Sequence, residues 1–191
     1  IMLIVCGSAT SWMVNKLLGD KGGLHNRVTH SMYLAPFTLS ETEEFLKYNG
    51  VVFNRHQVTE CYMMLGGTPY YLNMLRPDQS LPQNINRLFF GETAELRREF
   101  DFLLRSLFKD SDVYRKVVEI LSKNSVGMTR KQIVEAGKLN DGGKLSEVID
   151  ELCNCDFIKR FRSFHKKERE VVYQLTDLFS LFYIKYVKDA N

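Results

Sequence analysis

Four consecutive residues, Gly66, Gly67, Thr68 and Pro69, constrain the fold of this chain more than any other feature. The first glycine can end the preceding helix with a positive φ, and the second lets another body approach the backbone closely. Threonine can cap the next helix, and proline suits its first position. The segment therefore predicts a sharp corner between two helices. It is either an ordinary corner or one edge of a site for a flat ligand such as a nucleotide.

The residues around this corner predict a small helical bundle. An S-x-x-E capping box that begins at Ser40 predicts a helix to about residue 48. Apolar residues recur at helical spacing over residues 55–65, which predicts a second helix with one buried face. Further helices are expected over residues 69–75, 83–90 and 94–107.

The first residues predict part of an α/β domain. An apolar run over residues 1–5 is typical of a buried strand, and a second strand is expected over residues 28–34. Small polar residues, among them Ser8, follow the first strand at the end where open α/β sheets place their ligands. Because the apolar run begins at residue 1, we expect the chain to be a fragment that starts inside a longer domain.

The second half predicts a different unit. Helices are expected over residues 112–124, 130–136 and 144–153, followed by strands over residues 158–164 and 171–175. Three helices followed by a hairpin are typical of the winged-helix variant of the helix-turn-helix. A last amphipathic helix over residues 177–187 has a large aromatic face, which we expect to pack on a protein partner or on a missing domain.

The predicted fold class is mainly α with minor β. We expect the carboxyl-terminal part of a P-loop ATPase core over residues 1–37 and a helical lid bundle over residues 38–107. A winged helix is expected over residues 108–176, followed by the amphipathic helix over residues 177–191.

Several motifs are missing from the sequence. It contains no G-x-x-x-x-G-K-[ST] phosphate loop and no strand that ends in the acidic pair needed for Mg²⁺, so this chain alone cannot hydrolyse ATP. The four cysteines lack the spacing of a metal site, and no signal peptide or membrane span is recognisable. We expect a cytoplasmic protein without a metal site, in which Cys6 and Cys61 are buried thiols.

Taken in order, the segments resemble the carboxyl half of the AAA-type ATPases of archaea and bacteria, relatives of the STAND and origin-recognition P-loop ATPases. Residues 3–9 are similar to the family's sensor-1 strand, and residues 23–27 to its Gly-Arg segment. Residues 34–37 look like the entry into the lid, and residues 67–69 look like the G-x-P motif. The resemblance covers nearly the whole chain.

The resemblance implies a parent protein that binds and hydrolyses ATP. Ser8 would orient the attacking water or touch the γ-phosphate, and Arg27 would sense that phosphate or reach into a neighbouring subunit. Gly67, Thr68 and Pro69 would line the adenine side of the pocket, and Mg²⁺ would bind through residues missing from this chain. Each position also has a structural explanation: Ser8 as the partner of a strand-end backbone group, Arg27 as an ion-pair partner and Pro69 as a helix start.

The sequence departs from the family in two ways. The phosphate loop and its acidic partner strand are absent, so the chain provides at most half of a nucleotide pocket. Asn26 stands where the family often has a glycine before the arginine.

The winged helix has two candidate partners, DNA and protein. A DNA reader would hold phosphates with the basic residues of the hairpin, Lys159, Arg160, Arg162, Lys166, Lys167 and Arg169. The third helix fits this role less well, because Glu147, Asp150 and Glu151 would repel the DNA backbone unless they point elsewhere. A docking or regulatory role toward protein is therefore favoured. The alternative to the ATPase hypothesis is a winged-helix DNA-binding regulator without ATPase activity.

Overall fold

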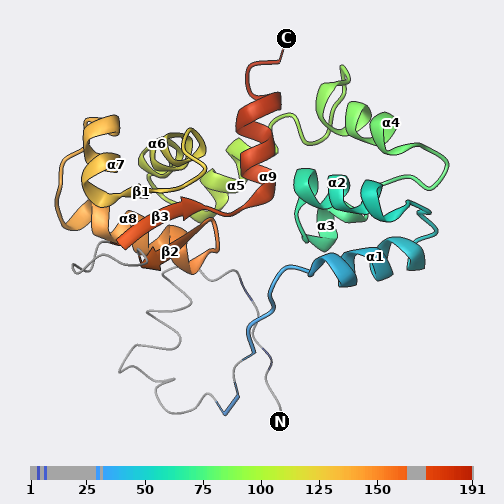
Figure 1. Ribbon diagram of the computed structural model, residues 1–191, viewed down its shortest axis with the longest axis horizontal. Coiled ribbons are helices and arrows are strands. Elements are labelled where there is room, and N and C mark those ends of the chain that lie inside the picture. Colours follow the sequence, from blue (N-terminus) through green and yellow to red (C-terminus); the bar gives the residue numbers. More distant parts are fainter. Residues whose placement is uncertain (1–3, 5–6, 8–28, 31, 163–170, 191) are drawn as a thin grey trace. The chain divides into compact units, whose positions relative to one another are not determined.

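The computed structural model describes residues 4, 7, 29–30, 32–162 and 171–190, and the chain divides into two compact units (Figure 1). The helical unit combines Leu34–Leu103 with Asp177–Asn191. The mixed unit comprises Leu104–Thr176 together with Ile1–Tyr33. The described residues are mainly helical, with one three-stranded antiparallel sheet. The expected fold class of mainly α with minor β is confirmed at this level.

Two capped helices open the helical unit. Helix α1 (Leu39–Tyr48) and helix α2 (Arg55–Leu65) each begin with a reciprocal capping box, Thr38 with Glu41 and Asn54 with Gln57. The prediction of a box at Ser40 is wrong by two residues, because Thr38 has the extended backbone that a cap requires, whereas Ser40 is already helical. The predicted bounds of α2 are confirmed.

Of the next two helices, the one predicted over residues 69–75 is shorter in the structure, and the one predicted over residues 83–90 begins two residues earlier. Helix α3 (Pro69–Leu72) is a single turn, and helix α4 (Leu81–Ile85) continues as the π-helical turn η2 (Asn86–Phe90). The loop between α3 and α4 closes around the buried Asn84 side chain. The Asn84 amide accepts from the Arg76 N–H at 2.8 Å and donates to the carbonyls of Arg76, Gln79 and Ser80. A buried amide with all these hydrogen bonds fixes the conformation of the loop.

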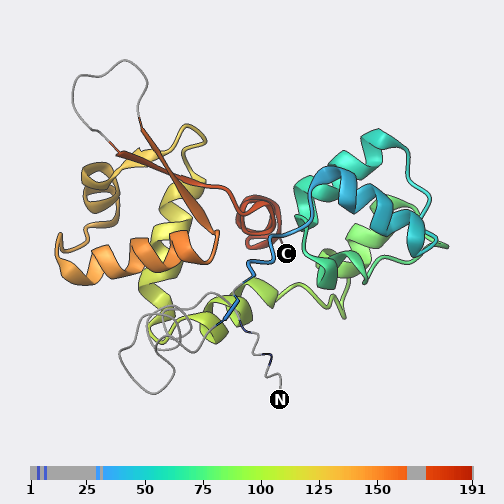
Figure 2. The ribbon, with the colours of Figure 1, turned by 90° about the horizontal axis from the view of Figure 1, so that it is seen from below.

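The last helix completes the helical unit. Helix α9 (Leu178–Phe182) continues as the π-helical turn η3 (Tyr183–Val187), seen end on in Figure 2. The Phe179 ring stacks on Tyr71 with ring centroids 4.6 Å apart, and Tyr183 stacks on Phe100 at 5.1 Å. From the sequence we expected the aromatic face of this helix to pack on a partner or a missing domain. Most of that face is covered within the helical unit itself, although Tyr186 remains 57% exposed.

Two predicted elements differ in the structure. Helix α5 (Glu99–Leu107) begins later than the expected residue 94, because residues 91–98 form turns in which the Leu96 N–H donates to the Leu88 carbonyl at 2.9 Å. The strand expected over residues 28–34 is wrong for the part that the structure describes, since residues 29–30 and 32–34 form no strand. Met32 and Leu34 are exposed, and no described strand pairs with this segment.

Beyond the end of α5, the described residues of the mixed unit form three helices and three strands. Its helices are α6 (Ser111–Ser122), α7 (Arg130–Gly137) and α8 (Gly143–Asn154), and its strands are β1 (Met128–Thr129), β2 (Ile158–Arg162) and β3 (Val171–Leu175). The sheet order is β1-β3-β2, and Met128 pairs with Tyr173. The predicted helices and the hairpin are present, while β1 was not expected, because two residues give no recognisable alternation.

Candidate functional site

The corner at Gly66–Pro69 is held by the chain's own backbone. Gly66 ends α2 with a φ of +66°, as predicted. Gly67 is buried, and its carbonyl accepts from the Phe37 N–H at 2.7 Å. A Cβ atom at position 67 would lie 2.0 Å from the Phe37 carbonyl oxygen. The predicted close approach at Gly67 is therefore confirmed, and the approaching body is the backbone of Phe37.

The next two residues of the corner lie nearer to solvent. The Thr68 side chain makes no capping hydrogen bond, so the predicted cap is wrong; the Tyr71 and Leu72 N–H groups already donate to the Thr68 carbonyl. Pro69 occupies the first helical position as predicted, and it is exposed together with Tyr70. A ligand at this corner would thus meet the Thr68 hydroxyl and the rings of Pro69 and Tyr70.

Tyr71 connects the corner to the rest of the helical unit. Its ring stacks on Phe179, and its hydroxyl donates to the Glu99 carboxylate at 3.2 Å. Burial, with the nearby carboxylates of Glu99 and Asp177, raises the pKa of the Tyr71 phenol far above its usual range. The hydroxyl therefore remains a protonated donor, and α3 is fixed to both the start of α5 and the last helix.

Five predicted site residues lie outside the described residues. They are the proposed phosphate contacts Ser8 and Arg27 and the hairpin cations Lys166, Lys167 and Arg169. Their assignments stay predictions.

The three remaining predicted cations lie on β2, and one of them is already paired. Arg160 forms an ion pair with Asp150 of α8, and its guanidinium carbon lies 6.0 Å from the centroid of the Tyr173 ring. Lys159 and Arg160 line a groove of about 550 Å³ with Asp150, Cys153, Asn154 and Phe161. Lys159 and Arg162 are exposed. The sequence identified these cations, whereas the pairing of Arg160 with Asp150 appears only in the folded unit.

The exposed side of α8 is acidic. Glu147 and Asp150 are exposed, while Glu151 is half-buried and accepts a hydrogen bond from the Tyr114 hydroxyl. Lys144 pairs with Asp110 at 2.8 Å and holds the pKa of that carboxyl below its usual range. Among Glu147, Asp150 and Glu151, the three carboxylates that the sequence predicted on this helix, Glu151 is therefore the one that is partly shielded from solvent.

The described cysteines lack the features of a reactive thiol. Burial raises the pKa of Cys61 to about 12 and that of Cys155 to about 11. The pKa of Cys153 is also raised by burial, with Arg160 acting in the opposite direction. No group of three potential ligands from His, Cys, Asp or Glu comes together for a metal within the described residues. In the same part of the chain, no helix has both the length and the apolar character to span a bilayer.

The chain is similar over nearly its whole length to a protein of Methanocaldococcus jannaschii. The chain is 26% identical over 189 residues to the uncharacterized protein MJECL04 of Methanocaldococcus jannaschii, in an alignment that covers 97% of this chain. The chain spans 40% of the length of that relative. No family model matches the chain. No solved structure matches it either.

The geometry at Gly67 gives a prediction about stability. We expect Gly67→Ala to lower the free energy of unfolding of the helical unit by about 2 to 3 kcal/mol, because the new methyl group would overlap the Phe37 carbonyl. The matched control is Gly91→Ala in the same unit, where the nearest atoms to a Cβ lie at 3.6 Å; its effect should stay below about 1 kcal/mol. Urea unfolding followed by circular dichroism measures both. Equal stabilities of the two variants would contradict the account of the corner.

The raised thiol pKa values give a prediction about alkylation. A raised pKa leaves less thiolate at pH 8, so iodoacetamide should modify Cys153 fastest, Cys155 more slowly and Cys61 slowest. All three rates should rise with pH. Peptide mapping by mass spectrometry follows each site, with the urea-unfolded chain as the control in which the three rates converge. A Cys61 rate in the folded chain equal to that in urea would refute its burial.

Proposed function

We propose that this chain is the sensor, lid and winged-helix part of an ATP-binding AAA-type ATPase. The helical unit would be the lid, and the mixed unit would be the winged helix. The order of elements supports this proposal: a helical bundle with a sharp Gly66–Pro69 corner precedes a helix–strand–helix–helix–strand–strand unit whose sheet order is β1-β3-β2. Strand β1 supports the proposal further, because it pairs with β3 and makes the hairpin part of a three-stranded sheet.

In the proposed ATPase, each region of the chain has a distinct task. ATP and Mg²⁺ would be held mainly by residues missing from this chain. Ser8 and Arg27 would approach the γ-phosphate, and Thr68, Pro69 and Tyr70 would face the adenine. Gly67 would act indirectly by keeping the corner against Phe37, because it is buried beneath that backbone.

The contacts of Tyr71 suggest how the lid could respond to nucleotide. Tyr71 directly follows the exposed Tyr70. Its hydroxyl is hydrogen-bonded to Glu99, and its ring stacks on Phe179. A nucleotide that contacts the corner would therefore act on α3, α5 and the last helix together. Binding would favour the closed arrangement of the lid and hydrolysis would release it, since a ligand shifts such an equilibrium only through contacts that differ between the two states.

The ATPase proposal is tested on the full-length gene product. We expect it to hydrolyse ATP, and we expect Arg27→Ala to lower kcat at least about 100-fold while the Kd for ATP changes only a few-fold, as for an arginine that stabilises transition-state charge. Arg55→Ala, a change at an exposed arginine on α2, is the control and should leave both values unchanged. Absence of ATP turnover would refute the ATPase proposal, and unchanged kinetics in Arg27→Ala would refute the role of that arginine.

For the winged helix, we propose docking to protein in place of DNA reading. The helix that would enter the major groove exposes Glu147 and Asp150, and carboxylates there would face phosphates. The ion pair with Arg160 offsets the charge of Asp150, whereas Lys144 is paired with Asp110, so the charge of Glu147 remains on this face. The regulator alternative depends on DNA binding by this surface and is therefore less well supported.

A charge reversal on α8 separates the two roles. We expect the full chain to bind duplex DNA no more tightly than a non-specific Kd of about 10 to 100 μM at physiological salt. The variant Glu147→Lys with Asp150→Lys should bind at least about tenfold more tightly, because it removes the Glu147 carboxylate, releases Arg160 from its ion pair with Asp150 and adds two cations. Fluorescence anisotropy with labelled DNA measures this. Tight, salt-dependent binding by the unmodified chain that is lost in Lys166→Glu with Lys167→Glu would instead support the DNA reader.

A further inference from the structure

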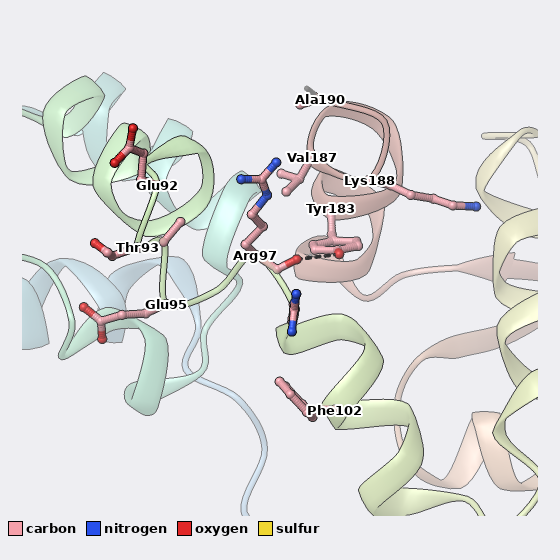
Figure 3. Close-up of a pocket in the computed structure, with 11 residues that line it drawn as sticks. Glu92, Thr93, Glu95, Arg97, Phe102, Tyr183, Val187, Lys188 and Ala190 are labelled. Carbon is pink, nitrogen blue, oxygen red and sulfur yellow. Dashed lines mark hydrogen bonds between the residues drawn. The ribbon is translucent and has the colours of Figure 1, made fainter.

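A second cavity lies within the helical unit. Its volume is about 530 Å³, and it lies between the turn before α5 and the last helix (Figure 3). The turn contributes Thr93, Arg97 and Arg98, and the last helix contributes Tyr183 and Val187. This volume falls in the range of sites that hold small molecules.

Two arginines give this cavity a positive character. Arg97 and Arg98 are exposed, and within the described residues neither guanidinium has a hydrogen-bond or ion-pair partner. Glu95, which also lines the cavity, is paired with Arg87 at 3.2 Å. In Figure 3 the carboxylates of Glu92 and Glu95 point away from the Arg97 guanidinium. The acidic residues therefore leave the charge of the arginines available.

The backbone that presents these arginines is fixed from two sides. The Tyr183 hydroxyl donates to the Arg97 carbonyl at 2.7 Å, and the Tyr183 ring stacks on Phe100. On the other side Leu96 is buried, and its N–H donates to the Leu88 carbonyl. Because this backbone is already fixed, the entropy lost on binding a ligand comes mainly from the two arginine side chains.

We propose that this cavity binds a small phosphate-bearing ligand. The planar guanidinium matches the oxygens of a phosphate in bidentate geometry, and two adjacent arginines suit a group with more than one negative charge. The exposed Phe102 ring adds an apolar wall. Lys188 also lines the cavity but points away from Arg97 in Figure 3, so it has no part in the proposal. The site differs from the Gly66–Pro69 corner and does not depend on the proposed ATPase activity.

Isothermal titration of the 191-residue chain at low salt tests the proposal with two probes, inorganic pyrophosphate and ATP. We expect pyrophosphate to bind, and we expect Arg97→Gln with Arg98→Gln to weaken its affinity at least about tenfold. Arg76→Gln, at an exposed arginine of the same unit, is the matched control and should stay within about twofold of the unmodified chain. Circular dichroism checks that all variants are folded.

The outcomes separate the sources of the phosphate. Equal binding of pyrophosphate and ATP would support recognition of the phosphates alone, whereas arginine-dependent binding that is tighter for ATP would support a nucleotide as the source. Failure of both probes to bind at low salt would overturn the proposal, as would equal binding by the double variant. Arginine-dependent binding of poly-glutamate without binding of either phosphate probe would overturn it in favour of an acidic protein segment.

Discussion

The stacking of Phe179 on Tyr71 is the interaction on which the organisation of the helical unit depends. It joins the last helix to a single-turn helix that lies far earlier in the sequence, and the contacts of Tyr183 with Phe100 and Arg97 extend the same junction. Aromatic pairs of this kind stabilise a fold beyond the apolar area that they bury. The Leu104–Thr176 part of the mixed unit consequently lies, in the sequence, between the two parts of the helical unit. The last helix is an internal component of this unit.

In this arrangement the corner at Gly66–Pro69 is connected to several other segments of the helical unit. Phe37 holds the corner from one side through Gly67, while Tyr71 ties it to α5 and the last helix on the other. A ligand at Pro69 and Tyr70 would therefore act on a tightly connected set of helices, as a nucleotide-responsive lid requires. The mixed unit contributes a different kind of surface. Its exposed helix is acidic, and part of its basic strand is neutralised internally, which favours a protein partner over DNA.

Features of the fold that depend on neighbouring residues in the sequence could be predicted. The bounds of α2 and the start of α7 at residue 130 follow from caps and apolar spacing within a few residues, and the structure confirms both. Features that depend on distant contacts could not. The turns before α5 exist because Leu96 bonds to Leu88, and β1 exists because β3 pairs with it. The likeness of residues 28–34 to a strand is a local property, but a strand also needs a neighbour, and the described residues provide none.

The candidate site shows the same division between local and distant information. The glycine pattern correctly indicated a close approach at Gly67, but no local signal identified Phe37 as the group that approaches. The sequence also identified Arg160 as a cation, whereas its partner Asp150 becomes its neighbour only when α8 packs beside β2. The sequence did not mark Arg97 and Arg98 as a pair, because two adjacent arginines in a helix expected from residue 94 carry no signal of a cavity.

Amide hydrogen exchange on a chain that ends at Thr176, compared with the full chain, tests the central structural claim most directly. The account predicts that removal of the last helix strips protection from α2 and the Tyr71 segment, while α6, α8 and the β2–β3 pair keep their protection, because Phe179 and Tyr183 complete only the helical unit. Unchanged protection of α2 and Tyr71 in the shortened chain would contradict it.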